Sequence, residues 1–100
     1  MIVRGTTPTI TYTFRTVKVE DIAVANLTII QGDLTIAKTI ADARVAESTL
    51  SWELTQEETL SIDDETELTV QLRYRTTDGH AYATRKTKVD PYGILEDGVI

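Results

Sequence analysis

The side chains of this 100-residue chain that could hold a metal ion gather in one acidic stretch. Asp63, Asp64, Glu65 and Glu67 carry the carboxylate oxygens that Ca²⁺ prefers as ligands. Their spacing matches no recognised calcium-binding loop, and acidic runs of this kind are usually solvated turns. We therefore favour a solvated turn over a calcium site and expect no bound metal.

Residues that could act as catalysts are few. His80 is the only histidine, and the sequence indicates no serine that would form a catalytic constellation with it. Glu57 and Glu58 are neighbours, but no pocket that would make them an acid–base pair is predicted around them. The chain has no cysteine and no glycine-rich phosphate loop. These observations predict a protein that is not an enzyme and needs no cofactor.

The elements that carry these residues are expected to be β-strands of one domain, residues 1–100. The chain is long enough for one core, and with 41% hydrophobic but 6% aromatic residues that core must be mainly aliphatic. The abundant threonine is β-branched and favours the strand over the helix. The sequence shows no secretory signal pattern and no apolar run near the ~18 residues of a membrane span. We expect a soluble protein that is made in the cytoplasm.

The strongest folding signal is a long hairpin over residues 67–89. Apolar and polar residues alternate from Leu68 to Arg75, and Asp78-Gly79 predicts a tight two-residue turn. In that register Arg85 would point toward the core, so we expect a β-bulge or an edge position that lets it reach solvent. The opposite face of the predicted hairpin is basic with one aromatic: Arg73, Arg75, Tyr82, Lys86 and Lys88.

Further alternating segments predict the rest of an antiparallel sandwich. These segments are residues 9–14, 22–30, 34–40 and 49–54. Residues 55–58 (TQEE) form a capping box, which predicts at most one short helical turn near 55–60. About seven strands with frequent turn signals indicate an all-β, immunoglobulin-like β-sandwich. Trp52 is expected in its core, with an exposed ligand-stacking role as the less favoured interpretation.

Charge is unevenly distributed along the chain, whose net charge is −6. Residues 42–67 hold nine acidic side chains against Arg44 alone, and residues 73–88 hold five basic ones against Asp78 alone. The favoured interpretation is two solvated faces that partly neutralise each other; the other is a head-to-tail contact between copies. The acidic total argues against a nucleic-acid partner.

The last seven residues form an apolar segment with no evident place in the predicted sheets. This segment, residues 94–100 (ILEDGVI), holds four aliphatic residues. It and the first three residues of the chain are candidates for covering the open sheet edges. Either segment could do so within its own chain or from a neighbouring copy.

Four stretches resemble a family of small proteins encoded in prophages of Gram-positive bacteria. They are residues 1–14 (MIVRGTTPTITYTF), 54–60 (LTQEETL), 75–79 (RTTDG) and 97–100 (DGVI), so the resemblance extends over nearly the whole chain. It is carried by turn and cap residues and transfers no catalytic position. The resemblance implies a gene among tail or baseplate genes, beside larger proteins with a similar N-terminal sandwich. With that it implies a structural or assembly role in a virion.

We therefore predict a non-enzymatic phage or prophage virion protein, associated with the tail or baseplate, that acts through protein–protein contacts. Its expected partners are other virion proteins or further copies, not nucleic acid or a membrane. Its expected location is the host cytoplasm during assembly and then the virion. The candidate interaction surface consists of Arg73, Arg75, Tyr82, Lys86, Lys88, Ile94, Leu95, Val99 and Ile100.

Two other functions remain as alternatives. A ligand-binding module, for example for cell-wall carbohydrate, would need Trp52 and two or more tyrosines on one exposed face. An enzyme is the third and least favoured, and it would need a deep pocket that contains His80 and carboxylates.

Overall fold

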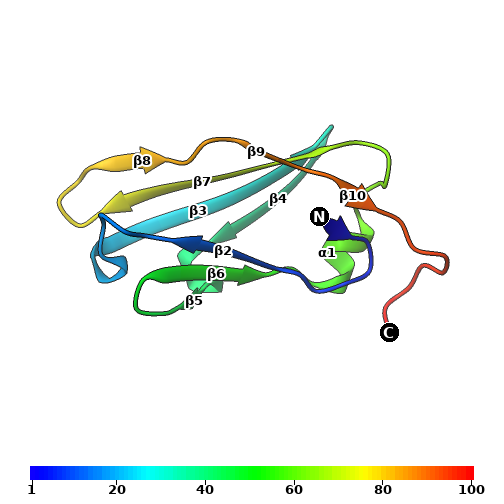
Figure 1. Cartoon of the computed structure of the whole chain (residues 1–100), viewed down its shortest axis with the longest axis horizontal. Coiled ribbons are helices and arrows are strands. Elements are labelled where there is room, and N and C mark those ends of the chain that lie inside the picture. The colour runs from blue at the N-terminus through cyan, green and yellow to red at the C-terminus, as the bar shows by residue number, and fades with distance from the viewer.

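Two antiparallel sheets face each other in this all-β sandwich, a computed structural model that describes residues 1–100 (Figure 1). The larger sheet consists of β4 (Leu34–Thr39), β3 (Ile22–Gln31) and β7 (Leu68–Thr76), followed along the free edge of β7 by β8 (Ala81–Ala83) and β9 (Thr87–Val89). The smaller sheet has the order β2 (Thr9–Thr13), β6 (Thr49–Glu53) and β5 (Arg44–Val45). The predicted β-sandwich is confirmed.

Short elements close the ends of the sandwich. β1 (Ile2–Val3) pairs in parallel with β10 (Pro91–Tyr92). The helix α1 (Gln56–Leu60) begins at the predicted capping box, in which Thr55 accepts from the Glu58 N–H and Glu58 accepts from the Thr55 N–H. Two 3₁₀ turns, Val19–Asp21 and Ile40–Asp42, precede β3 and β5.

The core lies between the inner faces of β3, β7 and β6. Leu27 is paired with Leu72 across β3 and β7, and both side chains are fully buried. Trp52 of β6 is also fully buried, and its indole N–H donates to the Thr39 carbonyl at 2.9 Å. The expected core position of Trp52 is confirmed, and an exposed stacking role for this residue is excluded.

The turn of the 67–89 hairpin differs from the prediction. The Gly79 N–H donates to the Thr76 carbonyl and the Thr76 N–H donates to the His80 carbonyl, which leaves a three-residue loop. Gly79 has a φ of 91°, whereas Asp78 has no positive φ, as a two-residue type I′ turn would require. The two-residue turn is therefore wrong. A glycine in the left-handed region at the end of a three-residue loop gives the same reversal.

One extra residue interrupts the return strand, as expected from Arg85. β8 pairs Tyr82 with Tyr74, whereas β9 pairs Val89 with Leu68, and these two registers differ by one residue. Between them, Thr84 exchanges two hydrogen bonds with the Leu72 backbone, one through its N–H and one through its hydroxyl. Arg85 lies in this bulge and is exposed. The bulge therefore keeps its guanidinium in water.

Replacing Trp52 by Phe is expected to lower the free energy of unfolding by about 1–3 kcal/mol. The Thr39 carbonyl loses its donor, and the smaller ring leaves a gap in the core. Urea denaturation followed by circular dichroism measures the change. The control, Tyr92→Phe, alters an exposed ring and is expected to stay within about 0.5 kcal/mol of the parent. Equal midpoints for Trp52→Phe and the parent would contradict this assignment.

Candidate functional site

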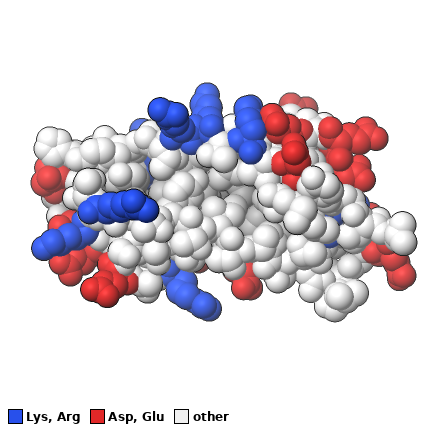
Figure 2. Space-filling view, viewed as in Figure 1, with Lys and Arg blue, Asp and Glu red and all other residues white.

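Four basic side chains lie on or beside the outer surface of the larger sheet, and we name them the basic face: Arg73, Arg75, Lys86 and Lys88. Arg73 and Arg75 alternate with the inward-facing residues of β7. Lys88 lies opposite Thr69 and donates to its hydroxyl at 2.8 Å. Lys86 is exposed in the bulge before β9. Figure 2 shows lysine and arginine side chains projecting together from this side of the molecule.

The basic face has no acidic partner within the chain. The structure contains two ion pairs, Arg4–Asp97 and Lys38–Glu58, and neither involves the basic face. The strands β3, β4 and β7 contain no acidic residue. Acidic side chains adjoin the basic ones in Figure 2 without pairing with them. The four cations are therefore free to meet an acidic surface of another molecule.

Tyr82 does not belong to this face, contrary to the prediction. Because Tyr82 lies directly opposite Tyr74, the two side chains share the inner side of the sheet. Their rings stack with centroids 5.2 Å apart, and Tyr74 in turn contacts Phe14 edge to face. Burial raises the pKa of Tyr74, and the neighbouring Tyr82 raises it further by a smaller amount. The three-residue loop shifts the register of β8 by one residue and is the physical reason for the change of face; the bulge restores the predicted register only after Tyr82, in β9.

The segment 94–100, here called the tail, is held at its start by close packing (Figure 1). A Cβ on Gly5 would lie 2.8 Å from the Ile94 side chain, and Gly5 has a φ of 74°. A Cβ on Gly93 would collide with the Asp64 carboxylate. Glycine at both positions therefore lets the tail lie directly on the chain beside α1.

Two polar side chains hold the rest of the tail. Arg4 donates to both carboxylate oxygens of Asp97, at 2.9 and 3.1 Å, and this contact raises the pKa of the Arg4 guanidinium. Gln56 of α1 accepts from the Ile100 N–H at 2.8 Å and donates to the Ile100 carbonyl at 3.1 Å. The tail thus packs within its own chain.

The tail presents its aliphatic side chains to solvent despite these contacts. Leu95 and Ile100 are fully exposed, Val99 is 57% exposed and Ile94 is 36% exposed. The tail and the basic face are separate: the tail lies at the α1 end, and acidic side chains lie between that end and the basic cluster in Figure 2. The structure therefore divides the predicted surface into two surfaces and removes Tyr82 from it.

The helix that anchors the tail is itself fixed by an ion pair. Lys38 of β4 contacts Glu58 of α1 at 2.8 Å. Burial raises the pKa of Glu58, but the hydrogen bonds from Lys38 and from the Thr55 N–H together outweigh it and lower that pKa. Glu58 thus joins the capping box to the larger sheet and holds Gln56 in place for the tail.

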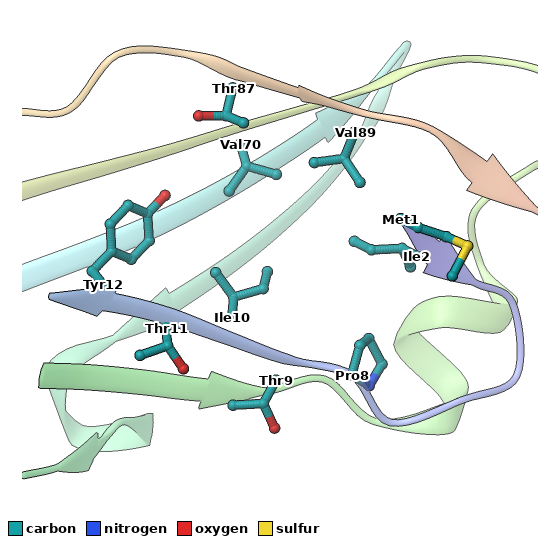
Figure 3. Close-up of a pocket in the computed structure, with 10 residues that line it drawn as sticks. All are labelled: Met1, Ile2, Pro8, Thr9, Ile10, Thr11, Tyr12, Val70, Thr87 and Val89. Carbon is teal, nitrogen blue, oxygen red and sulfur yellow. The ribbon is translucent and has the colours of Figure 1, made fainter.

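A groove opens between β2 and β9 on one side of the sandwich (Figure 3). It has a volume of about 330 Å³. Ile10 and Tyr12 point into it from β2, toward Val70 of β7 and Val89 of β9. Burial raises the pKa of Tyr12, and a hydrogen bond with Thr84 opposes that effect. This apolar groove can accept aliphatic side chains.

The acidic stretch serves as a turn. Asp63 accepts from the N–H groups of Glu65 and Thr66, and these hydrogen bonds lower its pKa. The buried Gln31 side chain bonds the Asp63 backbone in both directions and so fixes the turn to β3. No group of three or more potential metal ligands is found anywhere in the structure.

His80 lies at the hairpin tip, and its N–H donates to Asp78. It neither lines the groove nor contacts the tail.

None of the helices has the length and apolar character needed to span a bilayer. No protein-family model, no curated protein and no solved structure matches this chain.

The anchors of the tail and the groove were not predicted from the sequence. Arg4 and Gln56 bond residues 93 and 44 positions away, which no local pattern indicates. The capping box at Thr55 was the only available signal near Gln56. The groove depends on β2 and β9 coming together from the two ends of the chain.

Replacing Gln56 by Ala is expected to loosen the tail without unfolding the sandwich. The Ile100 N–H loses its acceptor, so its amide should exchange with solvent several-fold faster, as measured by NMR hydrogen exchange. The control, Glu57→Ala, changes the next, exposed residue of α1, which makes no side-chain contact with the tail. Equal exchange rates at Ile100 in both variants would contradict the anchoring role of Gln56.

Glu58 is expected to contribute to stability at neutral pH and to lose that contribution in acid. Its pKa is lower in the folded state, so the contribution is present above its ordinary value of 4.5 and disappears as the pH falls through the folded value. Unfolding free energies at about pH 7 and about pH 3 should therefore differ less in Glu58→Gln than in the parent. The same pH dependence in both proteins would refute this role.

Proposed function

We propose that this chain is a non-enzymatic structural or assembly protein of a phage or prophage virion, associated with its tail or baseplate, that acts by binding other proteins. The observation that carries the proposal is an ordered tail with exposed aliphatic side chains. Ordering a backbone costs about 1–2 kcal/mol per residue. Contacts with Arg4, Gly5 and Gln56 offset this cost, yet the apolar groups stay in water, which favours a docking segment.

The basic face supports the same role by a different interaction. Its cations have no ion-pair partner in the chain, so an acidic protein surface would gain their attraction without first breaking internal pairs. Such contacts steer encounters and set orientation more than they add affinity. The basic face would therefore orient the partner, and the tail would supply the apolar contact.

The virion setting is proposed because four stretches of the sequence resemble that family of prophage-encoded proteins. The residues that carry the resemblance include Asp97–Ile100, the part of the tail that Arg4 and Gln56 hold. They also include Thr55, the N-cap of the helix that presents Gln56. The resemblance, which extends over nearly the whole chain, thus includes residues that form and hold the tail.

Deleting the gene in a lysogen that carries it is expected to reduce the yield of infectious particles at least tenfold. Complementation with the full chain should restore the yield, and mass spectrometry should find the chain in purified particles. A chain that ends at Gly93 should not restore it. A chain with the charge reversals Arg73→Glu and Arg75→Glu should restore the yield poorly, because these substitutions replace two positive charges of the basic face by negative ones.

The matched control is Arg15→Glu with Arg44→Glu, which makes the same change in net charge at exposed residues outside the basic face. It should restore the yield as the parent does. Normal particles in the absence of the gene, or particles that lack the chain, would overturn the proposal. Equal loss in both double variants would assign the effect to net charge and overturn the role of the basic face.

A further inference from the structure

We infer that the groove between β2 and β9 accepts the tail of a second copy of this chain, which adds to β2 as an extra strand. The inference rests on the proposed function, because it takes the tail to be a docking segment. It names a second copy of the chain as the partner. Donor and acceptor are different surfaces of the same chain. The contact is therefore heterologous and links copies head to tail.

The free edge of β2 supplies the backbone groups for such a strand. The Leu54 N–H donates to the Pro8 carbonyl, and the Phe14 N–H donates to the Ser48 carbonyl. The even-numbered residues of this region therefore direct their backbone N–H and C=O groups toward β6. The N–H and C=O groups of Thr9, Thr11 and Thr13 therefore point to the other side, where β2 has no neighbouring strand. This edge carries no lysine and no bulge, the usual protections against strand addition.

The tail matches this edge in length and in side chains. The tail bends at Leu95, Glu96 and Gly98 in its own chain; once extended, its seven residues would span up to ~23 Å, against ~17 Å for the five residues of β2. A strand beside β2 would place alternate side chains in the groove, where Ile10, Val70 and Val89 present aliphatic surface. Leu95, Val99 and Ile100 are the exposed aliphatic side chains that this surface can cover.

Charge complementarity favours the tail over a purely apolar segment. The tail carries Glu96, which is in no ion pair, Asp97, which is paired with Arg4 of its own chain, and no basic residue. The segment 84–89 forms the bulge and β9 beside the groove; it carries Arg85 and Lys86 in the bulge, Lys88 on the outer face, and no acidic residue. None of these three cations is in an ion pair. Glu96 of a tail in the groove would lie near the uncompensated positive charge of the bulge.

The test uses two variants that each lack one half of the contact. A chain that ends at Gly93 keeps the groove and lacks the tail. Thr11→Pro keeps the tail and removes the outward N–H of β2, which no strand of the same chain uses, and the ring blocks the edge. Thr11→Val is the matched control, because it loses the same hydroxyl contact with Ser51 but keeps the N–H.

Analytical ultracentrifugation should show concentration-dependent association of the parent and of Thr11→Val, weaker at high salt. Each of the two half-contact variants should sediment as a monomer alone. An equimolar mixture of them should form a 1:1 heterodimer and nothing larger, because one chain can only accept and the other only donate. Thr87→Trp fills the groove from an exposed position of β9 and replaces Thr11→Pro if that variant fails to fold.

Four outcomes would overturn the inference: a monomeric parent at millimolar concentration, no heterodimer in the mixture, association that survives loss of the tail, or equal association of Thr11→Pro and Thr11→Val. Survival without the tail would assign the groove to another segment, and equal association of the Thr11 variants would assign the tail to another surface. A monomeric chain still incorporated into virions would refute this inference and leave the proposed function intact. A heterodimer from a chain absent from virions would do the reverse.

Discussion

The pairing of β3 with β7 is the constraint on which the other features of the sandwich depend. These long strands lie side by side, and Leu27, Ile29, Val70 and Leu72 fill the inner side of the pair. Because side chains alternate along a strand, burying this face forces the intervening residues outward. Arg73 and Arg75 of β7 are exposed for that reason. The core and the basic face are thus two consequences of a single register.

The bulge at Thr84–Lys86 then divides the return strand into two parts with different faces. Before the bulge, Tyr82 turns inward and stacks on Tyr74; after it, Thr87 and Val89 line the groove while Lys88 faces out. If the β8 register continued without the extra residue, Lys86 and Lys88 would lie opposite Val70 and Leu68 and face the core. The three-residue loop therefore removes an aromatic side chain from the basic face, and the bulge turns Thr87 and Val89 inward so that they form one wall of the groove.

Local patterns predicted what local interactions determine. The alternation of Ile10 and Tyr12 gave β2, the TQEE capping box gave α1, and the conflict at Arg85 gave the bulge. The turn type failed because Asp-Gly suits both two- and three-residue loops, and the choice depends on pairing beyond the turn. The face of Tyr82 failed with it. Contacts between the chain ends have no local signature, since they exist only after the sheets assemble.

The position of the tail explains why one chain leaves both its groove empty and its tail uncovered. β10 is held by β1 through the Ile2 and Arg4 N–H groups, so the chain leaves this pair in a fixed direction. The chain then continues along the α1 end, away from β2, because Gly93 packs against Asp64 and Ile94 packs against Gly5. A return into its own groove would break these contacts and reverse the chain within a few residues. The tail of a second copy needs no such reversal, and strand pairing with β2 would replace the contacts that Gln56 and Arg4 make with it in its own chain.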